Sequence, residues 1–379
     1  MRNTASDGNY AVIGLGAMGS AALFHLARRG KRVIGIEQFQ PGHDRGSSHG
    51  ESRAIRLGYS EHPSYVPLVR RAFENWRELE ALTGETVLTT TGILEAGKPG
   101  SRMVRGSLDA CLLHHLDHEL LDAREIHRRF PAFELPADFT AIWQPEGGFL
   151  KPELANRLHL DLARRHGAEV LAETRVTAIE PGANSVRIVI DGRTIEAGAV
   201  IVAAGAWVTD LVPALKPHIS IARLVLTWYE PKRPELFAPD MLPVFAVEGE
   251  DDIVYGFPDF AGTGFKCASH YSSGALTHAD LARQDAGAED EARTRRFLES
   301  YLPQGAGQML AMKTCMYTMT PDEDFVIDTL PDDPRIVVAS PCSGHGFKFA
   351  SVVGEVVADL ATVGETPHDI GRFRMGRWQ

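Results

Sequence analysis

The stretch Tyr10-Ala-Val-Ile-Gly-Leu-Gly-Ala-Met-Gly19 joins a short apolar run to three glycines in the spacing G-x-G-x-x-G. This pattern is typical of a β-strand that turns tightly into an α-helix. Gly14 allows the turn, Gly16 lets a pyrophosphate approach the backbone, and Gly19 lets the helix pack against the strand. The free N–H groups at the start of that helix would then face the phosphates.

The residues after the glycines complete a β-α-β unit. Residues 20–30 have the length and the apolar spacing of a crossover helix that ends at a glycine. Residues 31–36 are predicted to form a second strand that ends at Glu37, roughly 20 residues past the glycines, where an acid holds the ribose hydroxyls of a dinucleotide. We therefore predict a dinucleotide site, and this segment alone leaves both NAD and FAD open.

Composition and charge exclude several classes of protein. The chain has 379 residues, which is enough for two domains, and its net charge of -11 leaves no basic excess for nucleic acid or an anionic membrane. The longest apolar run, around residues 199–208, is too short to span a membrane, and the N-terminal residues lack an apolar signal core. The four cysteines have no C-x-x-C spacing, so we expect the reducing cytoplasm. His114, His115 and His118 lack an acid or cysteine at a ligand spacing, so no metal site is predicted.

A loop rich in hydrogen-bond donors, residues 40–56, follows the second strand. Its glycines, serines and histidines could wrap a phosphate or a ring edge. If the chain is helical from residue 51 onward, Arg53 and Arg56 lie three apart on one face and their guanidinium groups point the same way. A solvated basic patch is the alternative, and the position of the loop directly after the dinucleotide unit favours binding.

The rest of the chain alternates between two kinds of pattern. Residues 65–82 and 151–166 are predicted to be helices, and residues 199–207 a strand covered on both faces, with Gly205 allowing a cofactor to approach beyond its end. Short strands over residues 223–269 indicate a separate antiparallel sheet above the cofactor. The prediction is an α/β (α+β) chain with two domains. A Rossmann-like nucleotide-binding domain comprises residues 1–85, 151–218 and 321–379, and an antiparallel β-sheet substrate domain comprises residues 86–150 and 219–320.

Two pairs of residues share strand faces because side chains alternate along a strand. Lys266 and His270 would supply a fixed positive charge and a polar wall if they face inward, and nothing if they face outward; the alternation leaves both open. Cys315 and Tyr317 share a face of a later strand, although a buried cysteine is usually just a small apolar residue. Residues 340–349 form a glycine-rich turn that opens a helix and offers a second set of N–H donors.

These motifs together resemble the monomeric sarcosine oxidase and N-methyltryptophan oxidase family of FAD-dependent amine oxidases, within the larger D-amino-acid-oxidase-like group. The likeness covers nearly the whole chain. Besides the glycine fingerprint it rests on Gly46-Ser-Ser-His-Gly-Glu-Ser-Arg-Ala-Ile-Arg56, Tyr65-Val-Pro-Leu68, Tyr255-Gly-Phe-Pro258 with Lys266 and His270, Cys315-Met-Tyr-Thr318, Asp322-Glu-Asp-Phe325 and Ser343-Gly-His-Gly-Phe-Lys-Phe349. The later motifs are more specific than a Rossmann pattern, and they imply that the dinucleotide is FAD.

The resemblance also implies roles for individual residues around the flavin. Cys315 would be joined through sulfur to the 8α-methyl group, a bond for which a thiolate is the competent nucleophile. Lys266 would lie beside flavin N5 and help O2 to accept an electron, while Arg53 and His49 would line the flavin and assist its attachment. The further cofactor contacts implied are Gly14, Gly16, Gly19, Glu37, Ser47, Ser52, Val176, Gly205, Gly344, Gly346 and Lys348.

The same resemblance implies a substrate site and a reaction. Arg56 and Lys348 would bind a carboxylate, and Tyr255, His270 and Tyr317 would wall the site and share in catalysis. The reaction implied is oxidation of sarcosine or another N-methyl amino acid by O2, giving formaldehyde, the primary amino acid and H2O2, in an enzyme expected to be a monomer. N-methyltryptophan, pipecolate and glycated amino acids stay open as substrates. The rivals are an FAD dehydrogenase with another electron acceptor, an NAD-dependent reductase and an inactive flavin-binding module.

Three positions depart from the family pattern. Pro341 and Cys342 precede the Ser-Gly-His-Gly turn in place of larger apolar or glycine residues, and Leu57 follows Arg56 where a histidine is usual. We expect all three to lie near the site. They therefore bear on the identity of the substrate more than on that of the cofactor.

Overall fold

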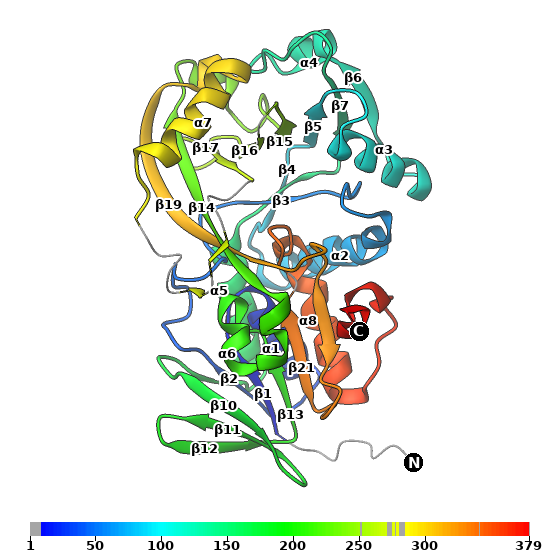
Figure 1. The fold of residues 1–379 in the computed structure, drawn as a ribbon, viewed down its shortest axis with the longest axis vertical. Coiled ribbons are helices and arrows are strands. Elements are labelled where there is room, and N and C mark those ends of the chain that lie inside the picture. The colour runs from blue at the N-terminus through cyan, green and yellow to red at the C-terminus, as the bar shows by residue number, and fades with distance from the viewer. Residues whose placement is uncertain are drawn as a thin grey trace.

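The computed structural model describes residues 9–250, 252–270, 275–276, 278–279, 285–340 and 342–378. Within these residues the strands form two large sheets and two small three-stranded ones. Figure 1 shows the large sheets at opposite ends of the long axis of the molecule, each with its own helices. Separate apolar clusters lie in the two halves, so each half has a core of its own.

The first large sheet has six strands in the order β20-β21-β13-β1-β2-β9. Its neighbouring strands are parallel except for the antiparallel pair β20–β21. Helices α1, α2, α5 and α8 belong to this half, where α1 packs against α5 and α8. The strands are β1 Tyr10–Ile13, β2 Val33–Ile36, β9 Glu169–Leu171, β13 Ala199–Val202, β20 Val326–Thr329 and β21 Ile336–Ser340, and the helices are α1 Ala17–Arg28, α2 Val66–Thr83, α5 Pro152–Arg165 and α8 Ala350–Val363.

This half confirms the β-α-β unit predicted around the glycines, because β1, α1 and β2 follow one another and β1 pairs in parallel with β2. The strand predicted at residues 199–207 is β13, which lies beside β1. It ends earlier than predicted, at Val202, because the chain turns into a 3-10 helix at Gly205–Trp207. Both strands are buried along their whole length, as expected for a parallel sheet covered on both faces.

The second large sheet has nine strands, in the order β18-β14-β17-β16-β15-β5-β7-β6 with β19 on the free side of β14. It is antiparallel apart from the parallel pair β5–β15, which the long segment between these two strands makes possible. The long strands β14 and β19 reach down towards the six-stranded sheet (Figure 1). The strands are β5 Ile93–Gly97, β6 Glu119–Asp122, β7 Thr140–Gln144, β14 Ser220–Glu230, β15 Val244–Glu248, β16 Ile253–Phe257, β17 Phe265–Ser269, β18 Ala275–Leu276 and β19 Gln308–Met319.

The small sheet β3-β8-β4 corrects one expectation. Residues 53–55 form strand β3, paired with β8, so the conditional prediction of a helix from residue 51 is wrong and Arg53 and Arg56 do not share a helix face. Gly50 and Glu51 have φ values of +94° and +69°, which a right-handed helix does not permit. The strands of the two small sheets are β3 Arg53–Ile55, β4 Leu88–Thr90, β8 Gly148–Leu150, β10 Val176–Pro181, β11 Val186–Ile190 and β12 Arg193–Ala197.

The six-stranded sheet takes its strands from all three stretches assigned to the nucleotide-binding domain, whereas β3-β8-β4 joins segments from both predicted domains. The domain boundaries therefore stay a prediction. The remaining α-helices are α3 Arg102–His114, α4 Ala123–Arg129, α6 Val208–Leu211 and α7 Ala288–Tyr301. Short 3-10 helices are Pro63–Tyr65, Gly205–Trp207, Pro213–His218, Pro234–Leu236, Pro303–Gly305, Phe347–Phe349, Gly371–Phe373 and Met375–Trp378.

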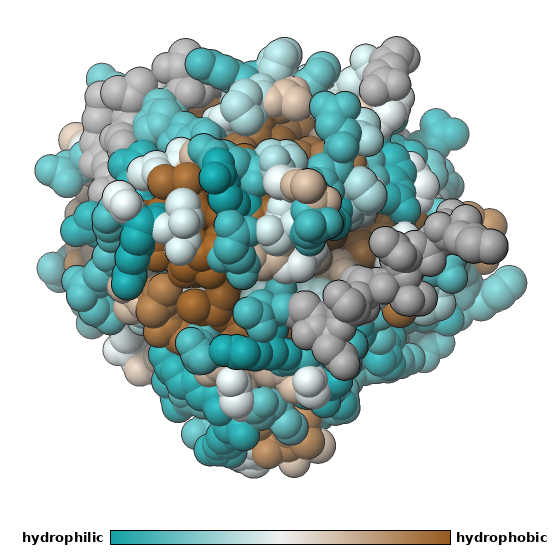
Figure 2. Space-filling view, turned by 90° about the horizontal axis from the view of Figure 1, so that it is seen from below, coloured by the Kyte–Doolittle hydropathy of each residue, from teal (hydrophilic) through white to brown (hydrophobic). Residues whose placement is uncertain are grey.

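Two further features concern the polarity of the surface and the length of the helices. Seen from the end that carries β10, β11 and β12, the surface is mostly hydrophilic, with apolar side chains gathered in a hollow (Figure 2). Across the described residues, every helix is too short or too polar to cross a membrane.

Candidate active site

One cavity collects most of the residues predicted for the site, although they come from distant parts of the chain. Four predicted residues, Gly19, His49, Ser52 and Lys266, are not among those that line it. The predicted residues that line it are Gly14, Gly16, Glu37, Ser47, Arg53, Arg56, Val176, Gly205, Tyr255, His270, Cys315, Tyr317, Gly344, Gly346 and Lys348.

The glycine turn at the start of α1 forms one end of the cavity. Gly14 has φ +85°, and a Cβ there would lie 2.5 Å from the carbonyl oxygen of Ala203. A Cβ at Gly19 would lie 1.7 Å from the Gly14 carbonyl oxygen, so Gly19 serves the packing of helix against strand. The N-cap residue of α1 is Gly16, which has no side chain to cap the helix. Ser48 Oγ accepts a hydrogen bond from Ala17 N over 3.1 Å. The helix therefore presents N–H groups and the positive end of its dipole to the cavity.

Glu37 lies at the end of β2, on the same side of the cavity. Its carboxylate accepts hydrogen bonds from Leu15 N at 2.7 Å and from Phe39 N at 3.0 Å. His43 Nε2 lies 3.3 Å from the same carboxylate. These contacts fix the acid that the fingerprint predicts for a ribose, and Val176 and Gly205 line the cavity as well.

The loop that carries His49, Ser52 and Arg53 is held from two sides. On one side Glu153 Oε1 accepts hydrogen bonds from Gly50 N at 2.6 Å and Glu51 N at 3.2 Å. On the other side Lys266 Nζ donates to the carbonyl oxygens of Gly50 at 2.7 Å and Ser52 at 2.6 Å. Glu153 thus holds the N–H groups of this short segment, and Lys266 holds its C=O groups.

Neither Lys266 nor His270 faces open solvent, but only His270 lines the cavity. Lys266 is buried under the loop, with its Nζ 4.2 Å from the centre of the Phe257 ring, while His270 lines the cavity itself. Burial, together with the nearby charge of Arg53, holds the pKa of Lys266 well below its usual value.

Two residues of this loop, which do not line the cavity themselves, have unpaired polar atoms. His49 is 4% exposed, and in the described part of the chain neither of its ring nitrogens has a hydrogen-bond partner. The hydroxyl of Ser52 also lacks one among those residues. Burial lowers the pKa of His49 to about 4, so its imidazole is neutral at pH 7. The glycine turn and the start of α1, which do line the cavity, fit the phosphates of a dinucleotide such as FAD.

Cys315 and Arg53 lie next to each other although 262 residues separate them. Arg53 Nη2 is 3.7 Å from Cys315 Sγ, and it also donates to the carbonyl oxygen of Ser47 at 2.8 Å. Cys315 and Tyr317 both line the cavity from β19, which confirms that they share a face. Arg53 therefore links the strand that carries Cys315 to the loop at residues 47–53.

Three aromatic side chains form a wall of the cavity. Tyr317 Oη lies 3.5 Å from Tyr255 Oη and 3.5 Å from His270 Nδ1. Burial raises the pKa of both tyrosines and lowers that of His270, so these groups are neutral at pH 7. The wall is therefore polar but uncharged.

Arg56 lies in the cavity between two acids. Its Nη2 donates to Glu61 at 2.6 Å and to Ser60 Oγ at 2.8 Å. Its Nε lies 3.0 Å from Glu95 Oε1. Burial disfavours the charge on Arg56, but Glu61 and Glu95 outweigh burial and raise its pKa. Arg56 therefore stays charged at any ordinary pH.

Lys348 is the second cation that lines the cavity near this point. It is buried, and its Nζ donates to the His345 carbonyl oxygen at 2.8 Å and to Tyr59 Oη at 3.5 Å. Burial, and then the charge of Arg56, lowers the pKa of Lys348 to about 7. Unlike Arg56, this cation loses its charge close to neutral pH.

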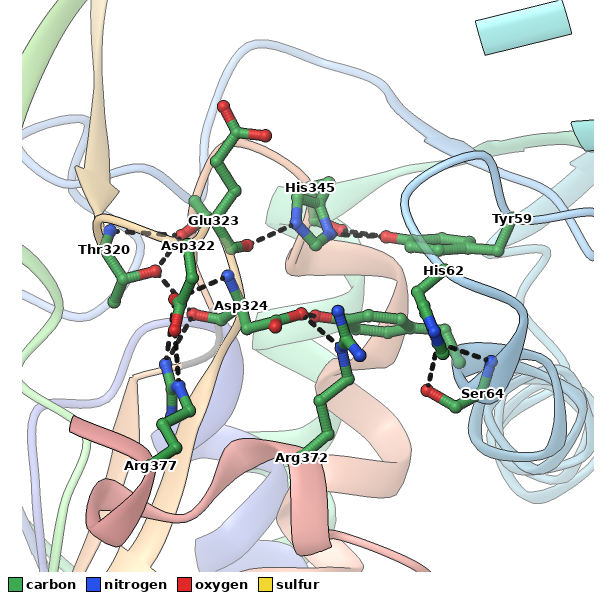
Figure 3. A network of polar contacts seen from close by, with 12 residues as sticks. Tyr59, His62, Ser64, Thr320, Asp322, Glu323, Asp324, His345, Arg372 and Arg377 are labelled. Carbon is green, nitrogen blue, oxygen red and sulfur yellow. Dashed lines mark hydrogen bonds and ion pairs between the residues drawn. The ribbon is translucent and has the colours of Figure 1, made fainter. Parts of the chain in front are cut away.

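A polar network surrounds His345 (Figure 3), whose carbonyl oxygen accepts the hydrogen bond from Lys348. His345 Nε2 lies 3.0 Å from the Glu323 carbonyl oxygen and its Nδ1 lies 2.5 Å from Tyr59 Oη. In the same network Asp324 accepts hydrogen bonds from Arg372 Nε and from the Tyr65 hydroxyl, both at 2.8 Å. The C-terminal residues thus brace the turn on which Lys348 lies.

Several residues that line the cavity were missed by the sequence predictions. The two acids at Arg56 are the most important of these, and Glu95 carried a usable signal: it is a single charge inside an apolar strand. A charge at such a position usually has a buried partner. The other missed lining residues include Ser48, His43, Asn156, Thr174, Arg175, Trp207, Arg102 and Met103.

The three departures from the family pattern have different outcomes. Cys342 lines the cavity, as expected. Leu57 follows the lining residue Arg56 in the chain, but it does not line the cavity itself and lies in the apolar core. Pro341 lies outside the described residues.

The fold and the cavity define an oxidoreductase that uses FAD. A dinucleotide-binding β-α-β unit meets an antiparallel sheet over a cavity that holds paired cations, an uncharged aromatic wall and a cysteine beside an arginine. Within the described residues there is no group of three or more side chains of His, Cys, Asp or Glu that could hold a metal ion.

Comparison with known proteins agrees with this class. Residues 9–360 match the DAO family, described as FAD dependent oxidoreductase, and the chain belongs to that family. A monomeric sarcosine oxidase of Streptomyces avermitilis is 42% identical over 96% of this chain and 95% of its own length. An N-methyl-L-tryptophan oxidase of Yersinia pestis is 37% identical over 98% of this chain and all of its own length. In structure, NikD, an amino acid oxidase essential for nikkomycin biosynthesis, is similar with a TM-score of 0.85 and 25% identity, over 97% of each chain. The resemblance drawn from the sequence motifs is therefore confirmed.

Proposed function

We propose that this protein is an FAD-dependent oxidase of secondary amines, which demethylates sarcosine or another N-methyl amino acid with O2 as the electron acceptor. The observation that carries the proposal is the pair of cations Arg56 and Lys348 in the same cavity as Cys315 and the aromatic wall. A guanidinium and an ammonium suit a carboxylate, the group that all amino acid substrates share. The relatives named sarcosine oxidase and N-methyl-L-tryptophan oxidase support the same substrate class.

FAD would be held along the cavity by residues of both halves. The glycine turn and α1 suit the pyrophosphate, and Glu37 suits the ribose. Ser47, His49, Ser52, Arg53, Gly344 and Gly346 would surround the ring, and Cys315 Sγ would be bonded covalently to the 8α-methyl group. When bound, FAD supplies the acceptor for the hydride equivalent that leaves the N-methyl carbon.

The protein residues orient the substrate and control its charge. Arg56 and Lys348 bind the carboxylate, so the amine lies against Tyr255, His270 and Tyr317. Because these three side chains are neutral, the wall offers no counter-charge to an ammonium and favours the reactive, unprotonated amine. Lys266, held in place by two backbone carbonyls, would favour the reduction of O2 in its protonated form by placing positive charge where negative charge develops.

The first test is an activity panel with the purified holoenzyme. Sarcosine, N-methyl-L-tryptophan, pipecolate and a glycated amino acid are supplied in air, and H2O2 and formaldehyde are measured. Equal amounts of both products from an N-methyl amino acid are expected. Turnover that requires an artificial acceptor and yields no H2O2 would favour the dehydrogenase. Turnover of none of these amines, with or without such an acceptor, would contradict the proposal.

The second test concerns the bond to Cys315. Yellow colour should stay with the acid-precipitated wild-type protein and leave the Cys315→Ala variant. Cys342→Ala is the matched control, because it removes another thiol that lines the same cavity, and it should keep its flavin. Flavin that is released from the wild-type protein would refute the covalent bond.

We also propose that the enzyme acts as a monomer in the cytoplasm. Both cations, the aromatic wall and Cys315 come from one chain, so the cavity needs no second copy to supply them. The four cysteines are free thiols, which a reducing compartment preserves. Sedimentation of the holoenzyme at several concentrations would test the monomer.

A further inference from the structure

Glu95 is a buried carboxylate beside the proposed substrate site. It lies on β5, lines the cavity and is 1% exposed. Its Oε2 accepts hydrogen bonds from Ser107 Oγ at 2.6 Å and from Gln144 Nε2 at 3.1 Å, and its Oε1 lies 3.0 Å from Arg56 Nε. All of its strong partners are protein groups, so it is placed to hold other residues and not to bind a ligand directly.

Gln144 extends this arrangement to the backbone next to Arg56. The side-chain oxygen of Gln144 accepts a hydrogen bond from Gly58 N at 2.6 Å, and its Nε2 lies 3.4 Å from the Gly58 carbonyl oxygen. A Cβ at Gly58 would lie 2.9 Å from Gln144 Nε2, so the close approach depends on glycine. Glu95 and Gln144, on neighbouring strands, therefore fasten the guanidinium of Arg56 and the backbone two residues later.

The three ends of the guanidinium of Arg56 differ in their surroundings. Nε forms an ion pair with Glu95 at 3.0 Å without the geometry of a hydrogen bond. Nη2 donates to Ser60 and to Glu61, whose side chain is 24% exposed. Among the described residues no hydrogen bond to Nη1 is found. Nη1 is thus the end that a carboxylate in the cavity can use.

We propose that Glu95 is a positioning residue, which acts through Arg56 on the binding of the substrate's carboxylate; this inference rests on the proposed function. By holding Nε from the nine-stranded sheet, it keeps the guanidinium of Arg56 turned so that Nη1 faces the cavity. Without it, the strongest remaining partner of Arg56 is Glu61, which lies nearer to solvent, and the guanidinium turns towards that acid.

A purely electrostatic role makes the opposite prediction. If Glu95 only weakened the positive charge of Arg56, its neutralisation would make the cavity more positive and an anionic ligand would bind more tightly. Glu95→Gln separates the two, because the amide has nearly the same shape but no charge. Its NH2 group would also face either Gln144 Nε2 or Arg56 Nε, both of which are donors, so the orientation of Arg56 is lost.

The experiment measures binding of (methylthio)acetate, a carboxylate with sulfur in place of the amine, by the change in flavin absorption of the holoenzyme. We expect Glu95→Gln to weaken binding about tenfold, as for the loss of one buried ion-pair contact. Flavin content and the spectrum without ligand should match those of the wild type. KM for the amino acid substrate should rise by a similar factor, with a much smaller change in kcat.

Two further variants keep the proposal falsifiable if Glu95→Gln folds poorly. Ser107→Ala removes a partner of Glu95 on the side away from Arg56, and a smaller loss of affinity in the same direction is expected. In an Arg56→Gln background, Glu95→Gln should have no further effect on binding, whereas a general structural role would add to the loss.

Glu248→Gln is the matched control, because Glu248 is a second acid that lines the cavity and makes no contact with Arg56 among the described residues. An equal loss of affinity in this control would overturn the proposal, and so would unchanged or tighter binding by Glu95→Gln. A wild-type holoenzyme that neither binds (methylthio)acetate nor oxidises an amino acid would overturn the proposed function, and the role of Glu95 with it.

Discussion

Lys348 is the cation of the proposed carboxylate site whose charge changes near neutral pH. Burial and the charge of Arg56 lower the pKa of Lys348 to about 7. Several titratable groups around it keep their charge state between pH 6 and 8. Burial lowers the pKa of His345 to about 4, burial raises that of Tyr59, Arg56 stays protonated and the charge of Arg56 lowers the pKa of Glu61. Burial raises the pKa of Glu95, so a change in carboxylate binding over this range reports on Lys348 only if it is lost in Lys348→Met.

The magnitude follows from the protonated fraction. With a pKa of about 7 in the free enzyme, Lys348 is about 90% protonated at pH 6 and about 10% protonated at pH 8. If only the ammonium form binds a carboxylate well, the Kd rises about tenfold between these pH values, which corresponds to about 1.4 kcal/mol. Rising pH weakens binding, because the lysine gives up the proton that the bound carboxylate needs.

The assay is a titration of the holoenzyme with (methylthio)acetate at several pH values, followed by flavin absorption. This ligand has no amine, so it adds no titration of its own in the range. Lys348→Met should bind weakly at pH 6 and should lose the pH dependence. Lys313→Met is the matched control, because Lys313 is exposed on β19 and does not line the cavity, and it should behave as wild type. A Kd that is equal at pH 6 and pH 8 in the wild type, or a pH dependence that persists in Lys348→Met, would refute the reasoning.

Three further predictions concern stability and cofactor binding. Gly14→Ala should lower FAD affinity more than tenfold in an FAD titration, since its Cβ would lie 2.5 Å from a backbone carbonyl oxygen. Gly30→Ala is the control, because its Cβ would have nothing within 4 Å, and urea unfolding should show a loss of only about 1 kcal/mol of stability. Asp324→Ala leaves the buried hydroxyl of Tyr65 without its partner, so urea unfolding of the holoenzyme should show a loss of about 2–3 kcal/mol, and an unchanged midpoint would contradict this. Burial lowers the pKa of His159 to about 3, so the stability that its neutral imidazole contributes is fully present above pH 6.5 and falls as pH drops towards 3. His159→Phe should remove at least about 2 kcal/mol of that acid-induced loss. Equal acid sensitivity of the variant and the wild type would count against this prediction.

The nucleotide half of the fold could be predicted almost residue by residue, because its signals are local. β1 and α8 lie within two residues of their predicted positions, and the helix predicted at residues 65–82 is α2, Val66–Thr83. Apolar periodicity and glycine placement act over a few residues and do not depend on the rest of the chain. The family resemblance rested on equally local motifs, and the full-length relatives confirm it.

Where local signals were ambiguous, contacts between distant segments decided the structure. Residues 53–55 became a strand because β8, nearly a hundred residues later, offers them a hydrogen-bonding edge. Alternation placed Lys266 and His270 on one face but did not choose which, and the choice came from the packing of β17 against the loop at residues 50–52. The extent of the two domains is still a prediction.

By itself the sequence determined the dinucleotide unit, the kinds of residues present and the family. Only the tertiary structure decided which charges meet: Arg53 beside Cys315, and Arg56 between Glu61 and Glu95. The physical reason is that the environment of a charge depends on which side chains surround it in space. Burial and neighbouring charges determine whether Lys348 or His345 is charged at neutral pH, and both arise only when segments hundreds of residues apart are packed together.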